Sequence, residues 1–165
     1  SGTFVTAREV LDEVGRDALR FFILMHDPNS HIDFDLELAK EKSKENPVYY
    51  VQYAHARIAS ILEKQKLSGD DVKFELLSSP YEIELLKQIS RLPELVFDVS
   101  SSFAVHRLTT YSSELADSFH SFYENCRIIG EKEDLMNARV ALISATKIAL
   151  KNTLSLLGIS APEKM

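Results

Sequence analysis

Several residue types are scarce in this chain of 165 residues, and each scarcity excludes a class of protein. The single cysteine, Cys126, excludes an intrachain disulfide framework and a metal site built from several cysteines, and it is typical of a reducing cytosol. No run of about 18 apolar residues is present, so the sequence predicts no membrane-spanning helix. No basic segment precedes an apolar stretch at the start, so we expect no signal peptide and a cytoplasmic protein.

The alternation of apolar and polar residues that marks half-buried strands is also rare, and no internal repeat is visible. Apolar residues recur instead at helical spacing through most of the chain. The sequence therefore predicts an all-α helical bundle, with a turn at 26–30, a loop at 67–71 and a possible bend at Ser100–Ser102. The helices are expected over 6–14, 17–25, 33–45, 47–65, 79–92, 94–126 and 132–157.

The expected helix ends rest on capping residues. Thr6-Ala-Arg-Glu9 and Ser79-Pro-Tyr-Glu82 match the capping box, in which the first and fourth side chains bond each other's backbone N–H. Asn46-Pro47 predicts a helix start, with asparagine as the cap and proline in the first turn. Pro93 predicts an interruption, and Gly158 is suited to the left-handed position that ends a helix.

Catalytic and metal-binding patterns are not found. The segment 27–38 has the acidic spacing of a calcium loop. However, Pro28 lies inside it, Ile32 stands where the loop needs glycine, and Leu38 stands where it needs a bidentate glutamate. A di-metal carboxylate bundle needs two Glu-x-x-His motifs, and only Asp117-x-x-His120 is similar. We therefore expect neither a catalytic residue nor a metal site in this chain.

The net charge of -6 argues weakly against a nucleic-acid partner, but the charge is unevenly distributed. Residues 1–45 and 69–126 are acidic, whereas residues 46–68 and 127–165 each carry a charge of +2. From Leu135 to Pro162 there is no acidic residue. The basic residues of that last stretch are Arg139, Lys147 and Lys151.

The expected helix 47–65 has two different faces. At about 100° per residue, Tyr49, Tyr50, Tyr53 and Arg57 share one side. Aromatic faces beside a guanidinium suit unpaired bases of folded RNA, although tyrosines also commonly pack against a neighbouring helix with only the hydroxyl in water. The opposite side, expected to face the bundle, carries Val48, Val51, His55, Ile58 and Leu62.

The string NPVYYVQYAHAR from Asn46 to Arg57, with DFDLELA from Asp33 to Ala39, resembles the C-terminal part of bacterial arginyl-tRNA synthetases. Asp17–Arg20 spells DALR, the nickname of the anticodon-binding domain in this family. The resemblance covers essentially the whole chain. Further similar segments are Asp12–Phe22, Ala138–Arg139 and Leu156–Met165.

The resemblance implies the anticodon-binding helical bundle of a class I synthetase. Residues 1–30 would form the junction after the catalytic domain with the first bundle helices, and 31–165 the anticodon-binding bundle. The family's ATP-handling signatures, His-Ile-Gly-His and Lys-Met-Ser-Lys-Ser, do not occur here, although Ser1–Phe4 resembles the residues directly after the second signature. The chain is thus expected to be non-catalytic and to hold no cofactor, with ATP and Mg²⁺ expected at the catalytic domain of the parent arginine–tRNA ligase.

The implied partners are the anticodon stem-loop of tRNA(Arg) and the parent's own catalytic domain, with no membrane. Tyr50 and Tyr53 match the pair that meets the anticodon loop, and Met165 matches a terminal residue that packs beside the recognised bases. Tyr49 belongs to the same face. The further candidates, as phosphate contacts or solvated surface, are Arg57, Arg139, Lys147 and Lys151. A helical domain whose tyrosine face docks a partner protein is the alternative.

Overall fold

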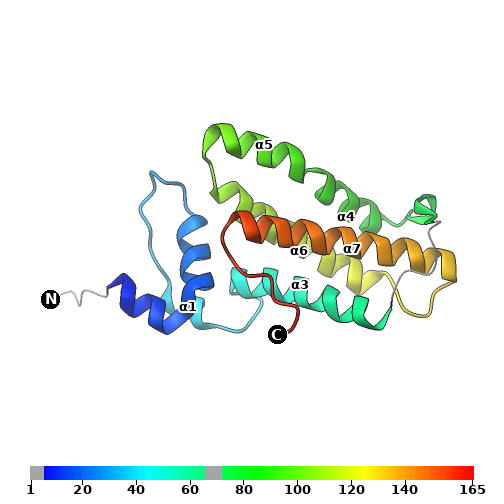
Figure 1. Cartoon of the computed structure of the whole chain (residues 1–165), viewed down its shortest axis with the longest axis horizontal. Helices are drawn as coiled ribbons and strands as arrows, with labels where there is room; N and C mark the ends of the chain where they lie inside the picture. Colours follow the sequence, from blue (N-terminus) through cyan, green and yellow to red (C-terminus); the bar gives the residue numbers. More distant parts are fainter. Residues whose placement is uncertain (1–5, 66–71) are drawn as a thin grey trace.

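The structure is a computed structural model that describes residues 6–65 and 72–165. The expected loop at 67–71 and the likeness carried by Ser1–Phe4 lie outside the described residues. Every regular element within the described residues is helical, which confirms the all-α prediction (Figure 1). The elements are α1 (Ala7–Leu24), α2 (Leu36–Lys40), α3 (Pro47–Lys64), a 3-10 turn η1 (Phe74–Leu76), α4 (Pro80–Ser90), α5 (Leu92–Ser102), α6 (His106–Asn125) and α7 (Glu133–Leu156).

Helix α1 consists of two helical pieces joined at Gly15. The capping box of Thr6 and Glu9 is present, as predicted. Gly15 has a φ of 81°, a left-handed conformation that glycine adopts at no steric cost, and the axis changes direction there. The expected division of this region into two helices is therefore confirmed.

The predicted helix over 33–45 is wrong for most of its length, because only the five residues of α2 are helical. The side chain of Asp35 caps the start of α2. The C-terminal end of α2 is held by Asn46, whose side-chain amide donates to the carbonyls of Ala39 (3.2 Å) and Glu41 (2.8 Å). Residues 41–45 are all charged or polar, so they have no apolar side chain with which to hold a helix against the bundle. The same Asn46 accepts from the backbone N–H of Tyr49 and so starts α3.

The second half of the chain follows its predicted caps closely. Pro93 stands in the first turn of α5 and separates it from α4, and the capping box of Ser79 and Glu82 starts α4. The expected bend after Ser100 is a full break, because Phe103 adopts a left-handed φ of 58° before α6 begins.

The hydrophobic core lies among α3, α6 and α7, which pack against one another, with α4 against α6 and α7 and α1 against α3 (Figure 1). The inward face of α3 is the predicted one, since Val51, His55 and Ile58 are fully buried. Other fully buried core side chains are Leu115, Phe119, Phe122, Leu142, Ile143, Leu150 and Leu154.

The residues of the DALR string join α1 to the end of α7. Arg20 donates through Nε to the carbonyl of Leu157, and Asp17 accepts from the backbone N–H of Ser160 (3.2 Å). Gly158 has a φ of 69°, a left-handed conformation that favours glycine, and a Cβ there would lie 2.7 Å from Arg20 Nε, so the arginine side chain would have to shift. The string therefore positions the C-terminal segment.

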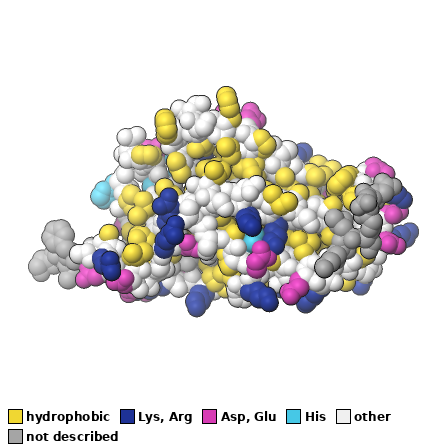
Figure 2. Space-filling view, in the orientation of Figure 1, with side chains coloured by type: hydrophobic (Ala, Val, Ile, Leu, Met, Phe, Trp, Pro, Cys, Tyr) yellow, Lys and Arg dark blue, Asp and Glu magenta, His cyan; other side chains and the backbone are white. Residues whose placement is uncertain are grey.

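The outer surface of α4 and α5 is rich in exposed apolar side chains (Figure 2). Phe97 and Phe103 are 72% and 77% exposed, and Ile83 and Leu86 lie exposed on the neighbouring helix. No helix among the described residues is long and apolar enough to cross a membrane.

The expectation that Arg139 is a solvated or phosphate-binding surface residue is wrong, because the residue is buried. Its Nε lies 2.7 Å from Oε1 of the buried Glu82, and its Nη1 donates to the carbonyl of Arg127. Burial of a charged pair of this kind is tolerated only while both partners are present. Arg139 is thus a structural residue of the α4–α7 contact.

Replacing one partner of this pair should be costly. We expect Arg139→Met to lower the free energy of unfolding by about 3–5 kcal/mol, because Glu82 is left buried without its counter-charge. The double variant Glu82→Gln/Arg139→Met keeps a side chain that can complete the capping box and should lose markedly less. Denaturant unfolding measures both; equal losses in the single and double variants would contradict this account.

Candidate functional site

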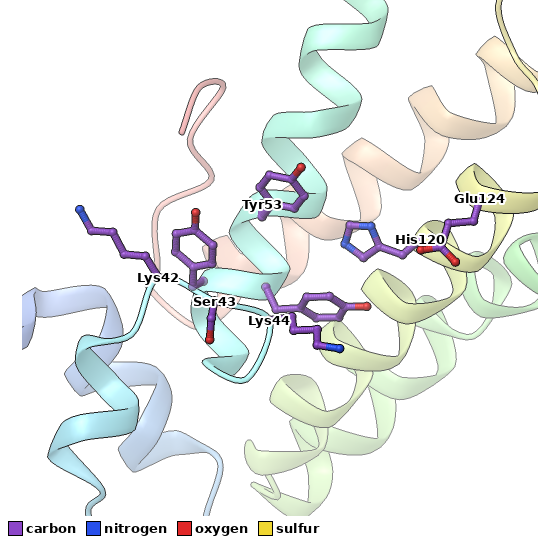
Figure 3. Close-up of a pocket in the computed structure, with 8 residues that line it drawn as sticks. Lys42, Ser43, Lys44, Tyr53, His120 and Glu124 are labelled. Carbon is purple, nitrogen blue, oxygen red and sulfur yellow. The ribbon is translucent and has the colours of Figure 1, made fainter.

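A pocket of about 490 Å³ lies between the α2–α3 loop, the first turns of α3 and the C-terminal part of α6 (Figure 3). It brings together three of the predicted residues, Tyr49, Tyr50 and Tyr53, with groups distant in sequence. Its remaining lining residues are Lys42, Ser43, Lys44, His120 and Glu124.

The pocket wall is a row of aromatic rings from two helices. The rings of Tyr49 and Tyr53, one helical turn apart, are within 10° of parallel with centroids 6.3 Å apart. The imidazole of His120, reaching from α6 toward α3 in Figure 3, stacks on Tyr53 at 5.9 Å and 20°. Several flat faces are therefore held at one place, an arrangement suited to planar ligands.

Two interpretations were considered for the tyrosine face, packing against a neighbouring helix and an exposed stacking surface. Tyr50 corresponds to the first and Tyr53 to the second. Tyr50 is partly buried and its ring lies 4.7 Å from that of His120. Burial, and next a hydrogen bond with Asp117, raise the pKa of the Tyr50 hydroxyl above its usual range, so it stays protonated. Tyr53 is 39% exposed and presents much of its ring to solvent.

His120 is a neutral side chain inside this aromatic cluster. Its ring also contacts that of Phe119, with centroids 5.3 Å apart. Burial lowers the pKa of His120, and this outweighs the nearby carboxylates of Asp117 and Glu124. Its Nε2 atom is buried and makes no hydrogen bond.

Arg57 lies one turn further along α3, outside the pocket lining. Its guanidinium carbon sits 4.9 Å above the ring of Tyr123, and its Nη2 donates to the Tyr123 hydroxyl at 2.8 Å. The side chain is exposed but held against α6. Arg57 thus extends the aromatic wall with a cation.

The lysines at the pocket, Lys42 and Lys44, were missed by sequence reasoning. Both belong to the KEKSK string from Lys40 to Lys44. The net charge of residues 1–45 hides this string, because the same segment contains ten acidic residues. Both side chains are exposed. In Figure 3, Lys44 extends toward α6, whereas Lys42 points to the opposite side, away from His120.

The remaining predicted cations do not join the pocket. Lys147 pairs with Glu163 at 2.6 Å, and this contact lowers the pKa of the Glu163 carboxyl. Lys151 is exposed on α7.

The C-terminal segment that carries Met165 runs across α3 (Figure 1). Gln52 donates to the carbonyl of Ser160 at 3.0 Å, and Nδ1 of the fully buried His55 lies 2.8 Å from the carbonyl oxygen of Pro162. Met165 itself is 55% exposed and does not line the pocket. The segment is held in place up to Glu163, and the terminal side chain projects from it.

No group of three or more His, Cys, Asp or Glu side chains within residues 6–65 and 72–165 is arranged to hold a metal ion.

The buried His55 and the partly buried His120 make stability depend on pH. Burial lowers the pKa of His55 and His120 below the ordinary value, so on acidification the unfolded chain takes up their protons first. We expect the free energy of unfolding to be level above about pH 7 and to fall as pH drops through about 6.5. Urea titrations between about pH 5.5 and 7.5 measure this.

His120→Phe serves as the matched variant for that titration, because it removes one of the two titrating rings. Its decline toward acid should be shallower than that of the wild type. A wild-type free energy of unfolding that stays constant over the range would refute the assignment of neutral buried rings.

Comparison with known proteins gives one family model and many relatives. Residues 51–165 match the model of the DALR anticodon binding domain. The chain is 53% identical to a protein named arginine–tRNA ligase from Geobacter sp. (strain M21) and 47% identical to one from Moorella thermoacetica. Each alignment covers the entire chain but only 31% and 30% of the relative, so the chain spans about a third of the length of these proteins.

Solved structures agree with this similarity. The arginyl-tRNA synthetase of Thermus thermophilus superposes with a TM-score of 0.80 at 30% identity, over 98% of this chain and 28% of that one. The arginyl-tRNA synthetase of Plasmodium falciparum gives 0.78 at 30% identity, over 90% and 26% of the two chains.

Proposed function

The chain belongs to the DALR anticodon binding domain family, and we propose that it binds the anticodon loop of tRNA(Arg) as part of an arginine–tRNA ligase. The observation that carries the proposal is the aromatic pocket, in which Tyr49, Tyr53 and His120 offer stacked planar faces beside exposed lysines. Single-stranded loops of RNA are recognised in this way, with unstacked bases laid on aromatic side chains.

The binding step is stacking supplemented by charge. A loop base lies against the exposed ring of Tyr53, a contact worth about 1–3 kcal/mol. Lys44 and Lys42, at the rim of the pocket, pair with the backbone phosphates on either side of that base. Arg57, already seated over Tyr123, adds a further cation along the path of the RNA.

In the whole ligase this domain would position the tRNA rather than carry out chemistry. The anticodon lies at one end of a tRNA and the accepting end at the other, so holding the first directs the second toward a catalytic domain. ATP and Mg²⁺ would act at that domain, which activates arginine. Met165 would then pack beside the bound bases from the segment anchored by His55 and Glu163.

Docking of a protein partner on the tyrosine face is the second candidate. A stable protein interface has an apolar, desolvated centre, whereas this pocket is bordered by Lys42, Lys44 and Glu124. Exposed apolar side chains gather instead on α4 and α5, at residues such as Phe97. These features favour RNA at the tyrosines.

Removal of the exposed ring tests the stacking role. We expect Tyr53→Ala to weaken binding of an arginine tRNA by roughly 5- to 100-fold, because one base loses its stacking partner. Filter binding or fluorescence anisotropy measures the change. Tyr53→Phe keeps the ring and should bind nearly as the wild type does.

Tyr81→Ala is the matched control, since Tyr81 is a similarly exposed tyrosine on α4 that does not line the pocket. Its tRNA affinity should equal that of the wild type. An equal loss in Tyr53→Ala and Tyr81→Ala, or no loss in either, would rule out the stacking assignment.

Salt dependence tests the lysines. Replacing Lys42 and Lys44 with glutamine should reduce the slope of log K against log salt by about 0.7 for each phosphate that is no longer neutralised. Lys87→Gln, an exposed lysine on α4, should leave the slope unchanged. A wild-type chain that binds no tRNA at low salt would instead favour the protein-docking candidate.

A further inference from the structure

We propose that His120 distinguishes the base held in the pocket, by a hydrogen bond from its imidazole to the base edge. This inference rests on the proposed function, since it assigns a role within the same site. Stacking on Tyr53 and phosphate pairing with Lys44 are insensitive to which base is bound. A site that prefers one base needs a polar group aimed at that base's edge.

The unsatisfied Nε2 atom of His120 is the observation that carries the proposal. Buried polar atoms in folded proteins almost always have a hydrogen-bond partner, because leaving one unpaired costs the loss of its hydration. Three buried side-chain nitrogens in the described residues have none: Nε2 of His55, Nδ1 of His106 and Nε2 of His120. His120 alone of these residues lines the aromatic pocket.

The chemical state of the ring suits a base edge. Burial keeps His120 neutral, and a neutral imidazole has one nitrogen that donates and one that accepts. Lys42 and Lys44 only donate, the Glu124 carboxylate only accepts, and the hydroxyl of Tyr50 is engaged by Asp117. His120 differs from the exposed hydroxyls of the pocket because its Nε2 is held in a fixed, buried place, so it can pair with a donor or an acceptor at a defined position on a base.

The position of the ring requires one movement on binding. The rings of Tyr50, Tyr53 and Phe119 pack against His120 and leave its Nε2 without access to solvent. Tyr53 is the exposed member of the three, so its side chain turns most easily. As a base enters, Tyr53 changes from stacking on His120 to stacking on the base, and the base edge reaches the imidazole.

Two substitutions separate the hydrogen bond from the ring packing. His120→Phe retains an aromatic ring against Tyr50 and Phe119 but removes both nitrogens. His120→Gln places an amide nitrogen near the position of Nε2 and restores a polar group. The probes are RNA stem-loops with an arginine anticodon and a series in which each loop base is replaced in turn.

We expect His120→Phe to bind the arginine stem-loop about tenfold more weakly than the wild type. Its preference at one loop position should also be reduced, so that the replaced and original bases bind alike there. His120→Gln should recover part of that preference. Circular dichroism and melting temperature check that the variants remain folded.

The outcomes distinguish this inference from the proposed function. If the wild type binds the stem-loop, Tyr53→Ala weakens it and His120→Phe alters neither affinity nor base preference, the role of His120 is refuted while the RNA site stands. If His120→Phe weakens all loop variants equally, the residue supports the pocket only by packing, which also refutes base discrimination. Failure of the wild type to bind any stem-loop overturns both.

Discussion

The burial of one face of α3 is the constraint on which the rest of the structure depends. Val51, His55 and Ile58 are inaccessible to solvent, and a helix that fixes those positions in the core also fixes the direction of every other side chain on it. Tyr49 and Tyr53 must then point toward the α2–α3 loop and α6. The aromatic pocket is in this sense the outer side of a well-packed core helix, which gives its rings a rigid support.

The bounds of α3 and its tyrosine face were predictable because both depend on local sequence. Asn46 caps α3 as its residue type predicts, and the helical period places Tyr53 opposite the core. The remainder depends on tertiary contacts that spacing along the chain does not encode. The approach of His120 to the tyrosines follows from the packing of α6 on α3, and Lys44 reaches the rim through the α2–α3 loop. The burial of Arg139 follows from the packing of α7 on α4.

Two of the basic side chains of residues 127–165 are used in ion pairs within the fold. The basic residues of 127–165 raise the formal charge of that segment, yet Arg139 faces Glu82 and Lys147 faces Glu163. These pairs hold helices and the C-terminal segment together, so two of the three basic side chains of α7 are engaged by carboxylates. The lysines at the pocket lie in a part of the sequence that is acidic overall, which favours recognition led by stacking over recognition led by long-range charge.

The anchoring of the C-terminal segment has a consequence for the order of folding. Its contacts join residues 107 positions apart at His55 and Pro162, and 143 positions apart at Asp17 and Ser160. Closure of such long loops has a large entropic cost that is offset only after the partner surfaces exist, so α1 and α3 must be docked before the segment settles. The C-terminal segment therefore takes its position from α1 and α3, because its long-range contacts are made to side chains that those two helices hold in place.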